Sequence, residues 1–127
     1  MTAPSTMSRA ELEQEVARLR HELSLMREER VFTALRNQFR LTPVETRFLM
    51  ALYDAKGEPL TSWALENISP SPSGLPRASN VVAVFISRLR TSIGRTTIET
   101  IWNRGWAMTP AGLAIVDKAL SDAGVTL

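Results

Sequence analysis

The chain has 127 residues, 44% of them hydrophobic, which gives room for one small domain with its own core and one appendage. Cysteine is absent, which excludes disulfides, thiolate metal sites and cysteine nucleophiles. The formal net charge of +2 is uneven, because residues 71–108 hold five arginines against one glutamate, a local charge of +4. Such a local surplus of arginine favours a polyanionic partner, nucleic acid first and an acidic protein second.

The N-terminal part of the chain predicts a tail and a long helix. Residues 1–8 hold proline and small polar residues without periodicity, which is typical of a flexible tail. Residues 9–39 are rich in helix formers, with Ser8 and Glu11 at capping-box spacing. Five apolar residues there follow the steps of a coiled-coil seam: Leu12, Val16, Leu19, Leu23 and Met26. Because Arg30 ends this short seam, the helix either pairs with its copy in a homodimer or lies back on the domain.

Threonine–proline pairs mark the starts of two further helices. Thr42–Pro43 opens an apolar helix that runs up to Gly57, and Thr109–Pro110 opens a C-terminal helix within residues 109–127. Between them, residues 62–68 predict a short helix whose Trp63 packs inward as part of the core.

A proline-rich loop and an amphipathic helix come next. Residues 69–79 hold three prolines and one glycine, so they form either a linker or a contact site for another protein. Residues 79–93 place an apolar stripe on one side of a helix: Val82, Ile86, Leu89 and Ile93. The opposite side carries a polar face: Asn80, Val84, Ser87, Arg88 and Thr91, with Arg90 on its flank. No carboxylate falls between Arg77 and Arg95.

This polar face suits double-stranded DNA. The B-form major groove admits one helix, arginine bonds the guanine edge and asparagine the adenine edge, and a small apolar side chain touches the thymine methyl. Arg88, Asn80 and Val84 match these three roles. Phosphate contacts are expected from three further arginines: Arg77, Arg90 and Arg95. The alternative is a solvated helix side that is basic without binding anything.

The order of the elements predicts a fold. After the amphipathic helix, two β-branched runs around Asn103–Gly105 read as a hairpin. Helix, helix, polar-faced helix and hairpin over residues 40–108 are the order of a winged helix-turn-helix. The predicted fold is therefore mainly α with a small β-hairpin, preceded by the long helix of residues 9–39 and followed by an extra C-terminal helix.

Three motifs point to a known family. L-T-P-x-E starts at Leu41, V-x-V-x-I-S-R-L-R at Val82, and R-G-W at Arg104. In this order they resemble the OmpR-like winged-helix effector domain of two-component response regulators, over about residues 40–108. The family usually has R-G-x-G-Y at the third motif. It also places a phospho-accepting receiver domain ahead of this module, where this chain has its long helix, so control by phosphorylation is not implied.

The resemblance implies roles for single residues. Ser87, Arg88 and Arg90 would face the major groove and phosphates, Val84 would meet base methyls, and Asn80 would lie at the helix entrance. Arg104 would occupy the tip of the wing that reaches the minor groove. The loop of residues 69–79 corresponds to the family's contact with RNA polymerase. Ala83 and Phe85 replace residues that are commonly polar, and Trp102 and Asn103 replace the usual wing chemistry, which leaves the target sequence open.

Catalysis is not expected from this composition. The single histidine, His21, lies on the N-terminal helix, and paired carboxylates or a phosphate-cradling glycine loop are missing. No cofactor or metal is therefore expected. Without an apolar leader or a run of roughly 20 apolar residues, we expect a cytoplasmic, nucleoid-associated protein of bacterial or phage origin.

The sequence is compatible with two functions. One is a sequence-specific, dimeric DNA-binding regulator of transcription, with either terminal helix as the dimer interface. The other is a protein-binding adaptor of winged-helix fold that acts on RNA polymerase or another regulator. Exposure of Phe85 and Trp102 would favour the adaptor.

Overall fold

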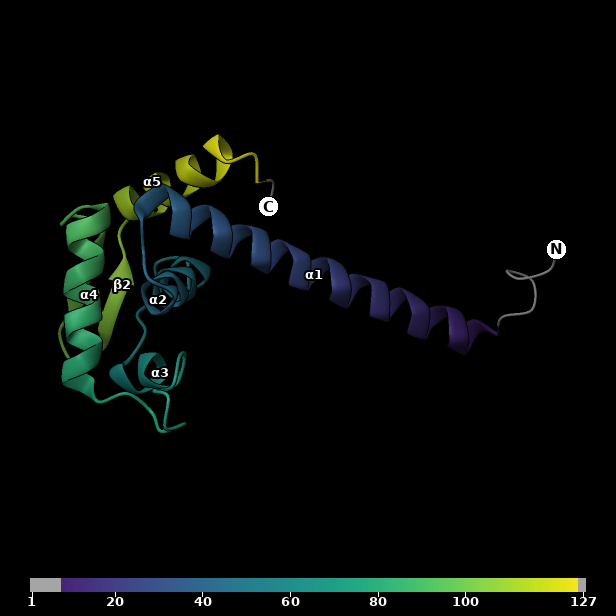
Figure 1. Cartoon of the computed structure of the whole chain (residues 1–127), viewed down its shortest axis with the longest axis horizontal. Helices are drawn as coiled ribbons and strands as arrows, with labels where there is room; N and C mark the ends of the chain where they lie inside the picture. Colours follow the sequence, from purple (N-terminus) through teal and green to yellow (C-terminus); the bar gives the residue numbers. More distant parts are fainter. Residues whose placement is uncertain (1–7, 126–127) are drawn as a thin grey trace.

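The chain begins with α1 (Arg9–Phe39), a 31-residue helix that projects from the domain (Figure 1). This computed structural model describes residues 8–125. The Ser8 hydroxyl accepts the backbone N–H of Glu11 at 3.2 Å, which caps the helix as predicted. Only the C-terminal part of α1 packs on the domain, through Val31, Ala34 and Leu35. The tail expected for residues 1–8 falls outside the described residues except for Ser8, the cap.

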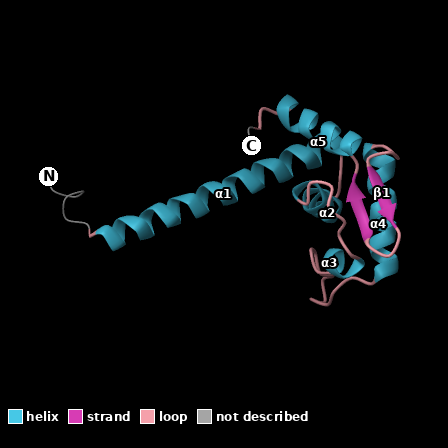
Figure 2. Ribbon diagram, turned by 180° about the vertical axis from the view of Figure 1, so that it is seen from behind, coloured by secondary structure: helices cyan, strands magenta, loops and turns pink. Residues whose placement is uncertain are grey.

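The sequence left two arrangements open for α1, pairing with its copy or lying back on the domain, and the projection of α1 bears on the second. Residues 9–30 are exposed, apart from the partly covered Glu15, and residues 9–24 extend away from the other elements in both ribbon views (Figure 2). The expectation that this helix lies back on the domain is therefore wrong for these residues. The predicted seam has no partner among residues 8–125 of its own chain.

Three helices follow and enclose the core. They are α2 (Pro43–Asp54), α3 (Ser62–Glu66) and α4 (Ser79–Ile93). A complete capping box fixes the start of α2, because Thr42 accepts from Glu45 N–H and the Glu45 carboxylate accepts from Thr42 N–H. Leu49, Leu52 and Phe48 of α2 are fully buried beneath α4. Burying each such side chain contributes about 1.5–3 kcal/mol.

A two-stranded antiparallel hairpin and a last helix complete the domain. Strand β1 (Ile98–Ile101) pairs with β2 (Gly105–Met108), with Ile98 opposite Met108. Helix α5 (Pro110–Asp122) then packs against α1 and β2, and the Tyr53 hydroxyl of α2 donates a hydrogen bond to the Asp117 carboxylate. The predicted class, a winged helix-turn-helix with an extra helix at each end, is confirmed.

The prediction for Trp63 is wrong. Its side chain is 73% exposed, whereas Leu65 of the same helix is fully buried. Helix α3 has only five residues, so it offers little more than one turn, and Leu65 takes the position that faces the core. An aromatic residue at the second helical position then lies on the outer side.

The length and the composition of the helices bear on membrane insertion. None of the helices within residues 8–125 combines the length and the apolar character that crossing a bilayer requires.

Candidate nucleic-acid interface

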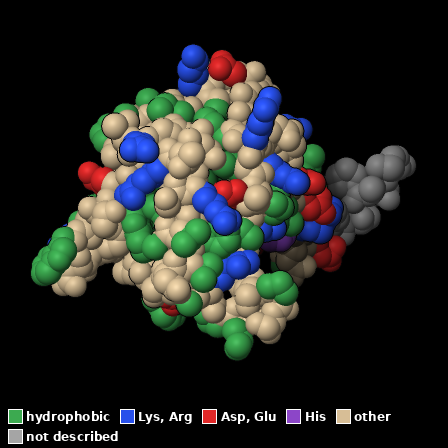
Figure 3. Space-filling model, turned by 60° about the vertical axis from the view of Figure 1, so that its left-hand side comes forward, with side chains coloured by type: hydrophobic (Ala, Val, Ile, Leu, Met, Phe, Trp, Pro, Cys, Tyr) green, Lys and Arg blue, Asp and Glu red, His purple; other side chains and the backbone are tan. Residues whose placement is uncertain are grey.

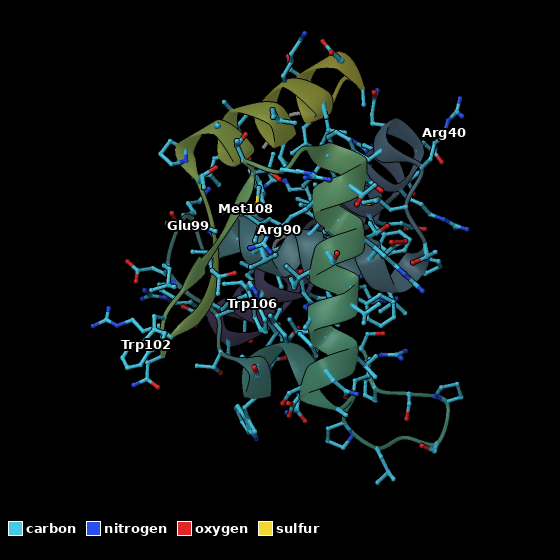
Figure 4. All side chains as sticks on the ribbon, turned by 90° about the vertical axis from the view of Figure 1, so that its left-hand side faces the viewer. Arg40, Arg90, Glu99, Trp102, Trp106 and Met108 are labelled. Carbon is cyan, nitrogen blue, oxygen red and sulfur yellow. The ribbon has the colours of Figure 1, made fainter. Side chains whose placement is uncertain are left out.

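Helix α4 presents its polar face to solvent. The apolar stripe predicted from the sequence is buried: Val82, Ile86, Leu89 and Ile93. All five residues of the polar face are exposed: Asn80, Val84, Ser87, Arg88 and Thr91. The structure therefore brings together on one uncovered surface the side chains that the sequence placed there. Neither α1 nor α5 lies over this surface (Figure 4).

The start of α4 is fixed by α3 and the preceding loop. The Ser79 hydroxyl donates to the Glu66 carboxylate, and the backbone N–H of Arg77 donates to the Glu66 carbonyl at 3.1 Å. Ala78, the N-cap residue, makes no side-chain cap bond, so these links to α3 replace a conventional cap. They hold the N-terminal turn of α4, and with it Asn80, at a fixed position on the domain.

Phe85 is a platform for two arginines. Its ring is partly buried and meets Phe48 edge-on, with centroids 5.4 Å apart. The guanidinium carbons of Arg77 and Arg88 lie 5.3 and 5.7 Å from the ring centroid. Cation–π contacts of this kind contribute about 0.5–1 kcal/mol each at exposed sites. The aromatic residue that replaces a commonly polar one therefore positions Arg88, a role that the sequence did not reveal.

Arg90 has a role that differs from the expected one. Its Nε donates to the Ile98 carbonyl at 3.0 Å and its Nη2 to Thr100 Oγ1 at 2.8 Å. The side chain therefore runs from α4 to β1, as Figure 4 shows. Two of its five N–H donors are committed within the domain. Arg90 ties the hairpin to α4, and three of its N–H donors remain for the predicted contact with phosphate.

Arg77 is likewise held within the domain. Besides lying over Phe85, its Nε donates to the Ser69 carbonyl at 2.6 Å, so it links the two ends of the 69–79 loop. The expected phosphate role of Arg77 competes with this bond. Leu75 at the far side of the same loop is 66% exposed.

The hairpin carries the remaining predicted residues. Arg95 precedes β1 and Arg104 lies in the turn between the strands, and both are exposed. Trp102, in the same turn, is 89% exposed and points away from the domain (Figure 4). Gly105 has a φ of +112°, and a Cβ there would lie 1.9 Å from the Leu60 carbonyl oxygen. A glycine is needed at this position because β2 passes so close to Leu60.

Basic residues also flank α4 on the side away from the hairpin. Arg40, at the end of α1, has a left-handed backbone (φ 53°). Its side chain projects outward on the opposite side of α4 from Trp102 (Figure 4). Basic and hydrophobic side chains are interspersed over this side of the molecule (Figure 3). The position of Arg40 could not be predicted from the sequence, because the local surplus of arginine lies in residues 71–108. Only the packing of α1 beside α2 brings it to this flank.

Fold and surface together define a class, the winged helix-turn-helix proteins with an uncovered polar-faced helix. The chain belongs to the family described as "Transcriptional regulatory protein, C terminal", whose family model matches residues 35–108. This is the OmpR-like effector domain that the three motifs indicated, a DNA-binding domain of transcriptional regulators and not an enzyme family. Searches among curated proteins and among solved structures found no similar protein.

Proposed function

We propose that this protein is a sequence-specific regulator of transcription that inserts α4 into the major groove of double-stranded DNA. The observation that carries this proposal is the polar face of α4, which is exposed along its whole length and contains no carboxylate. Nucleic acid is the partner of its family, which sets the class of ligand. As a DNA-binding protein it would act in the compartment that holds the chromosome, as expected for a bacterial or phage-encoded regulator.

Base reading falls to the polar face. Arg88, held over Phe85, offers two donors to the guanine edge, while Asn80 suits adenine and Val84 a thymine methyl. Ser87 and Thr91 extend this surface toward the C-terminal end of the helix. The Thr91 hydroxyl donates to the Ser87 carbonyl at 3.1 Å, so its oxygen keeps its lone pairs available as an acceptor. Each good base contact discriminates by about 1–3 kcal/mol.

Backbone contacts fall to the flanks. Arg95 precedes β1, Arg104 lies in the turn of the hairpin, and Arg40 projects on the other side of α4 (Figure 4), so we assign these three exposed arginines to the phosphates of the two strands. Arg104, at the tip of the hairpin, is the residue for the minor groove. Arg77 and Arg90 contribute charge from their bonded positions. We further propose that the regulator acts as a homodimer.

The test separates base reading from phosphate binding. Arg88→Ala should reduce affinity for a selected operator by about 1–3 kcal/mol and leave affinity for random duplex nearly unchanged. Arg95→Ala should weaken both duplexes alike and lower the slope of log affinity against log salt by about one. Arg9→Ala is the matched control, because it removes the same charge at the far end of α1. Equal losses on both duplexes for Arg88→Ala would remove its proposed role.

A protein-binding adaptor remains the second candidate, and exposed aromatic side chains favour it. Trp102 on the hairpin and Trp63 on α3 are largely exposed, and Leu75 marks the loop of residues 69–79 that would meet RNA polymerase or another regulator. Phe85 does not support this reading, because it is covered by its two arginines. An adaptor should bind random duplex barely at all, even at low salt, where the regulator binds and weakens steeply as salt rises.

A further inference from the structure

We infer that α1 forms a parallel, in-register two-stranded coiled coil with a second copy of this chain, which places both α4 helices at one end of the dimer. The orientation of the coil follows from charges on α1. The placement of α4 then constrains the symmetry of the DNA site, and that last step rests on the proposed function.

The surface involved is the seam of α1: Leu12, Val16, Leu19, Leu23 and Met26. These five side chains are between 43% and 55% exposed. The first four lie along the part of the helix that projects from the domain, and Met26 borders a hollow that residues 123–125 also line. Most helical stability in proteins comes from packing of an apolar face, and a row of solvated leucines adds nothing to α1 until a partner buries them.

The spacing of the seam fits a coiled coil of two strands. In the heptad abcdefg, Val16 and Leu23 take position a, and Leu12, Leu19 and Met26 take position d. A β-branched residue at a with leucine at d favours parallel dimers. Arg9 and Arg30 fall at the a positions just outside the seam, so the tightly paired stretch runs from Leu12 to Met26.

The charges beside the seam select the parallel arrangement. Position g carries Glu15, Glu22 and Glu29, and position e carries Glu13, Arg20 and Arg27. In a parallel coil each g residue faces the e residue five positions later, so Glu15 meets the partner's Arg20 and Glu22 meets the partner's Arg27. In an antiparallel coil g faces g, which sets glutamate against glutamate along that flank, and e faces e, where Glu13 alone can pair with an arginine.

The bonds within α1 are compatible with these pairs. Arg18, outside the seam, bonds both Glu15 and Glu22 along its own helix, with Nη1 2.6 Å from Glu22. Within residues 8–125, Arg20 and Arg27 form no ion pair. A carboxylate has two oxygens, so each glutamate can keep Arg18 and accept an arginine from the second copy.

The C-terminal helix is a poorer interface than α1. Its apolar residues Val116, Ala119 and Leu120 are buried within the domain, against α1 and β2. Ile115 is the large apolar residue that α5 leaves exposed in the described part of the chain, at 37%. One side chain of this kind does not form a seam.

The direction of α1 relative to α4 determines what the dimer presents. Helix α4 lies at the end of the molecule farthest from the start of α1 (Figure 1). A two-fold axis along a parallel coil therefore leaves both α4 helices at the same end, facing away from the coil. A two-fold protein matches a two-fold DNA site, so the operator would contain inverted half-sites.

The first experiment measures association of the full chain without DNA, by sedimentation equilibrium over micromolar concentrations. The wild type should be a dimer, and Val16→Lys with Leu23→Lys should be a monomer. Ala17→Lys with Ser24→Lys is the matched control, because it adds the same charges one residue along on exposed positions outside the seam, and it should stay dimeric. Three equal masses would overturn the proposal.

The second experiment determines orientation through single cysteines, which are clean probes because the chain has none. In a parallel coil, the Leu12→Cys variant and the Met26→Cys variant should each form a disulfide-linked dimer under air oxidation. In an antiparallel coil position d faces the partner's position a, so Leu12 faces the partner's Leu23, and only a mixture of the Leu12→Cys and Leu23→Cys variants would cross-link. Cross-linking confined to the mixture, or none in any sample, would contradict the parallel arrangement.

The DNA step is tested separately, by selecting bound sequences from a random duplex pool. The expected product is an inverted repeat, and the Val16→Lys, Leu23→Lys variant should select single half-sites. Direct repeats from the wild type would overturn the symmetry step. Because the mass and cross-linking results do not involve DNA, a failure of DNA binding is distinguishable from a failure of the coil.

Discussion

Helices α1 and α4 have the same apolar spacing and opposite surroundings. In both, apolar residues recur at steps of three and four. On α4 this stripe is at most 7% exposed, because α2 and α3 lie beneath it, and the polar face looks outward. On the projecting part of α1 the stripe itself faces solvent. A periodic pattern therefore predicts a helix and its apolar side, while the partner of that side depends on the fold.

The two exposed surfaces suit different partners. The polar face of α4 offers fixed donors and little apolar area, as base edges require. The seam of α1 offers leucine and valine side chains between charged flanks, as a second helix requires. We propose that one helix recognises DNA and that the other associates with its copy.

The largest difference is expected when one leucine on each helix is replaced by alanine. Leu89→Ala, in the core, should lower the free energy of unfolding by about 2–5 kcal/mol because it leaves a cavity. Leu19→Ala should change the stability of the monomer by less than about 0.5 kcal/mol, since its side chain has no tertiary partner. Urea unfolding at submicromolar concentration measures both. Similar losses would show that α1 is anchored along its whole length.

The close packing of the hairpin against Leu60 can be tested by adding one methyl group at Gly105. Gly105→Ala should destabilise the domain by about 2–3 kcal/mol, because the new Cβ would overlap the Leu60 backbone at a positive φ. Gly74→Ala is a suitable control, since it also has a positive φ but nothing within 4 Å of the added Cβ. Thermal unfolding of the two variants separates the clash from backbone strain alone. Equal shifts would remove the proposed close approach.

These residues mark the limits of prediction from the sequence. Helix caps at Thr42 and Thr109 and the buried stripe of α4 are set by neighbours within a few residues, so they could be predicted. The position of Trp63, the bonds of Arg90 and the flank position of Arg40 depend on packing between elements that are distant in sequence. Tertiary contacts of that kind leave no local pattern.

The same limit applies to the candidate site. The identity of its exposed residues followed from helical periodicity and from the family motifs. The contact of Arg77 with Phe85 did not, because Arg77 lies outside α4 and its position depends on the conformation of the 69–79 loop, whereas Arg88 follows Phe85 by one turn of the same helix. The signal available in the sequence was that Phe85 replaces a residue that is commonly polar in the family.

The platform can be tested by a substitution that keeps its apolar character. Phe85→Leu should lower affinity for the operator by about 1 kcal/mol, because Arg88 loses the ring that holds it. Fluorescence anisotropy of a labelled duplex measures this. Met50→Leu, a partly buried apolar exchange on α2, is the control and should leave affinity unchanged. A Phe85→Leu protein that binds like the wild type would show that the ring is packing alone.

The smallest effect concerns α2 and α5 in alkaline solution. Burial, with the hydrogen bond to Asp117, raises the pKa of Tyr53 to about 12. The folded state therefore favours the protonated phenol, and this contribution is complete below about pH 10 and lost as the pH rises toward 12. Tyr53→Phe should cost about 1 kcal/mol at neutral pH. Its stability should also fall less than that of the wild type between pH 10 and 12, as measured by urea unfolding.

The claim that the polar face of α4 binds DNA is tested most directly by NMR. Amide and side-chain shifts would be followed while a selected duplex is titrated into the protein. We predict that the largest changes fall on residues 80–91 and on Arg104, and that residues 12–26 of α1 do not change. Changes centred on Trp63 and Leu75, with residues 80–91 unaffected, would contradict the account.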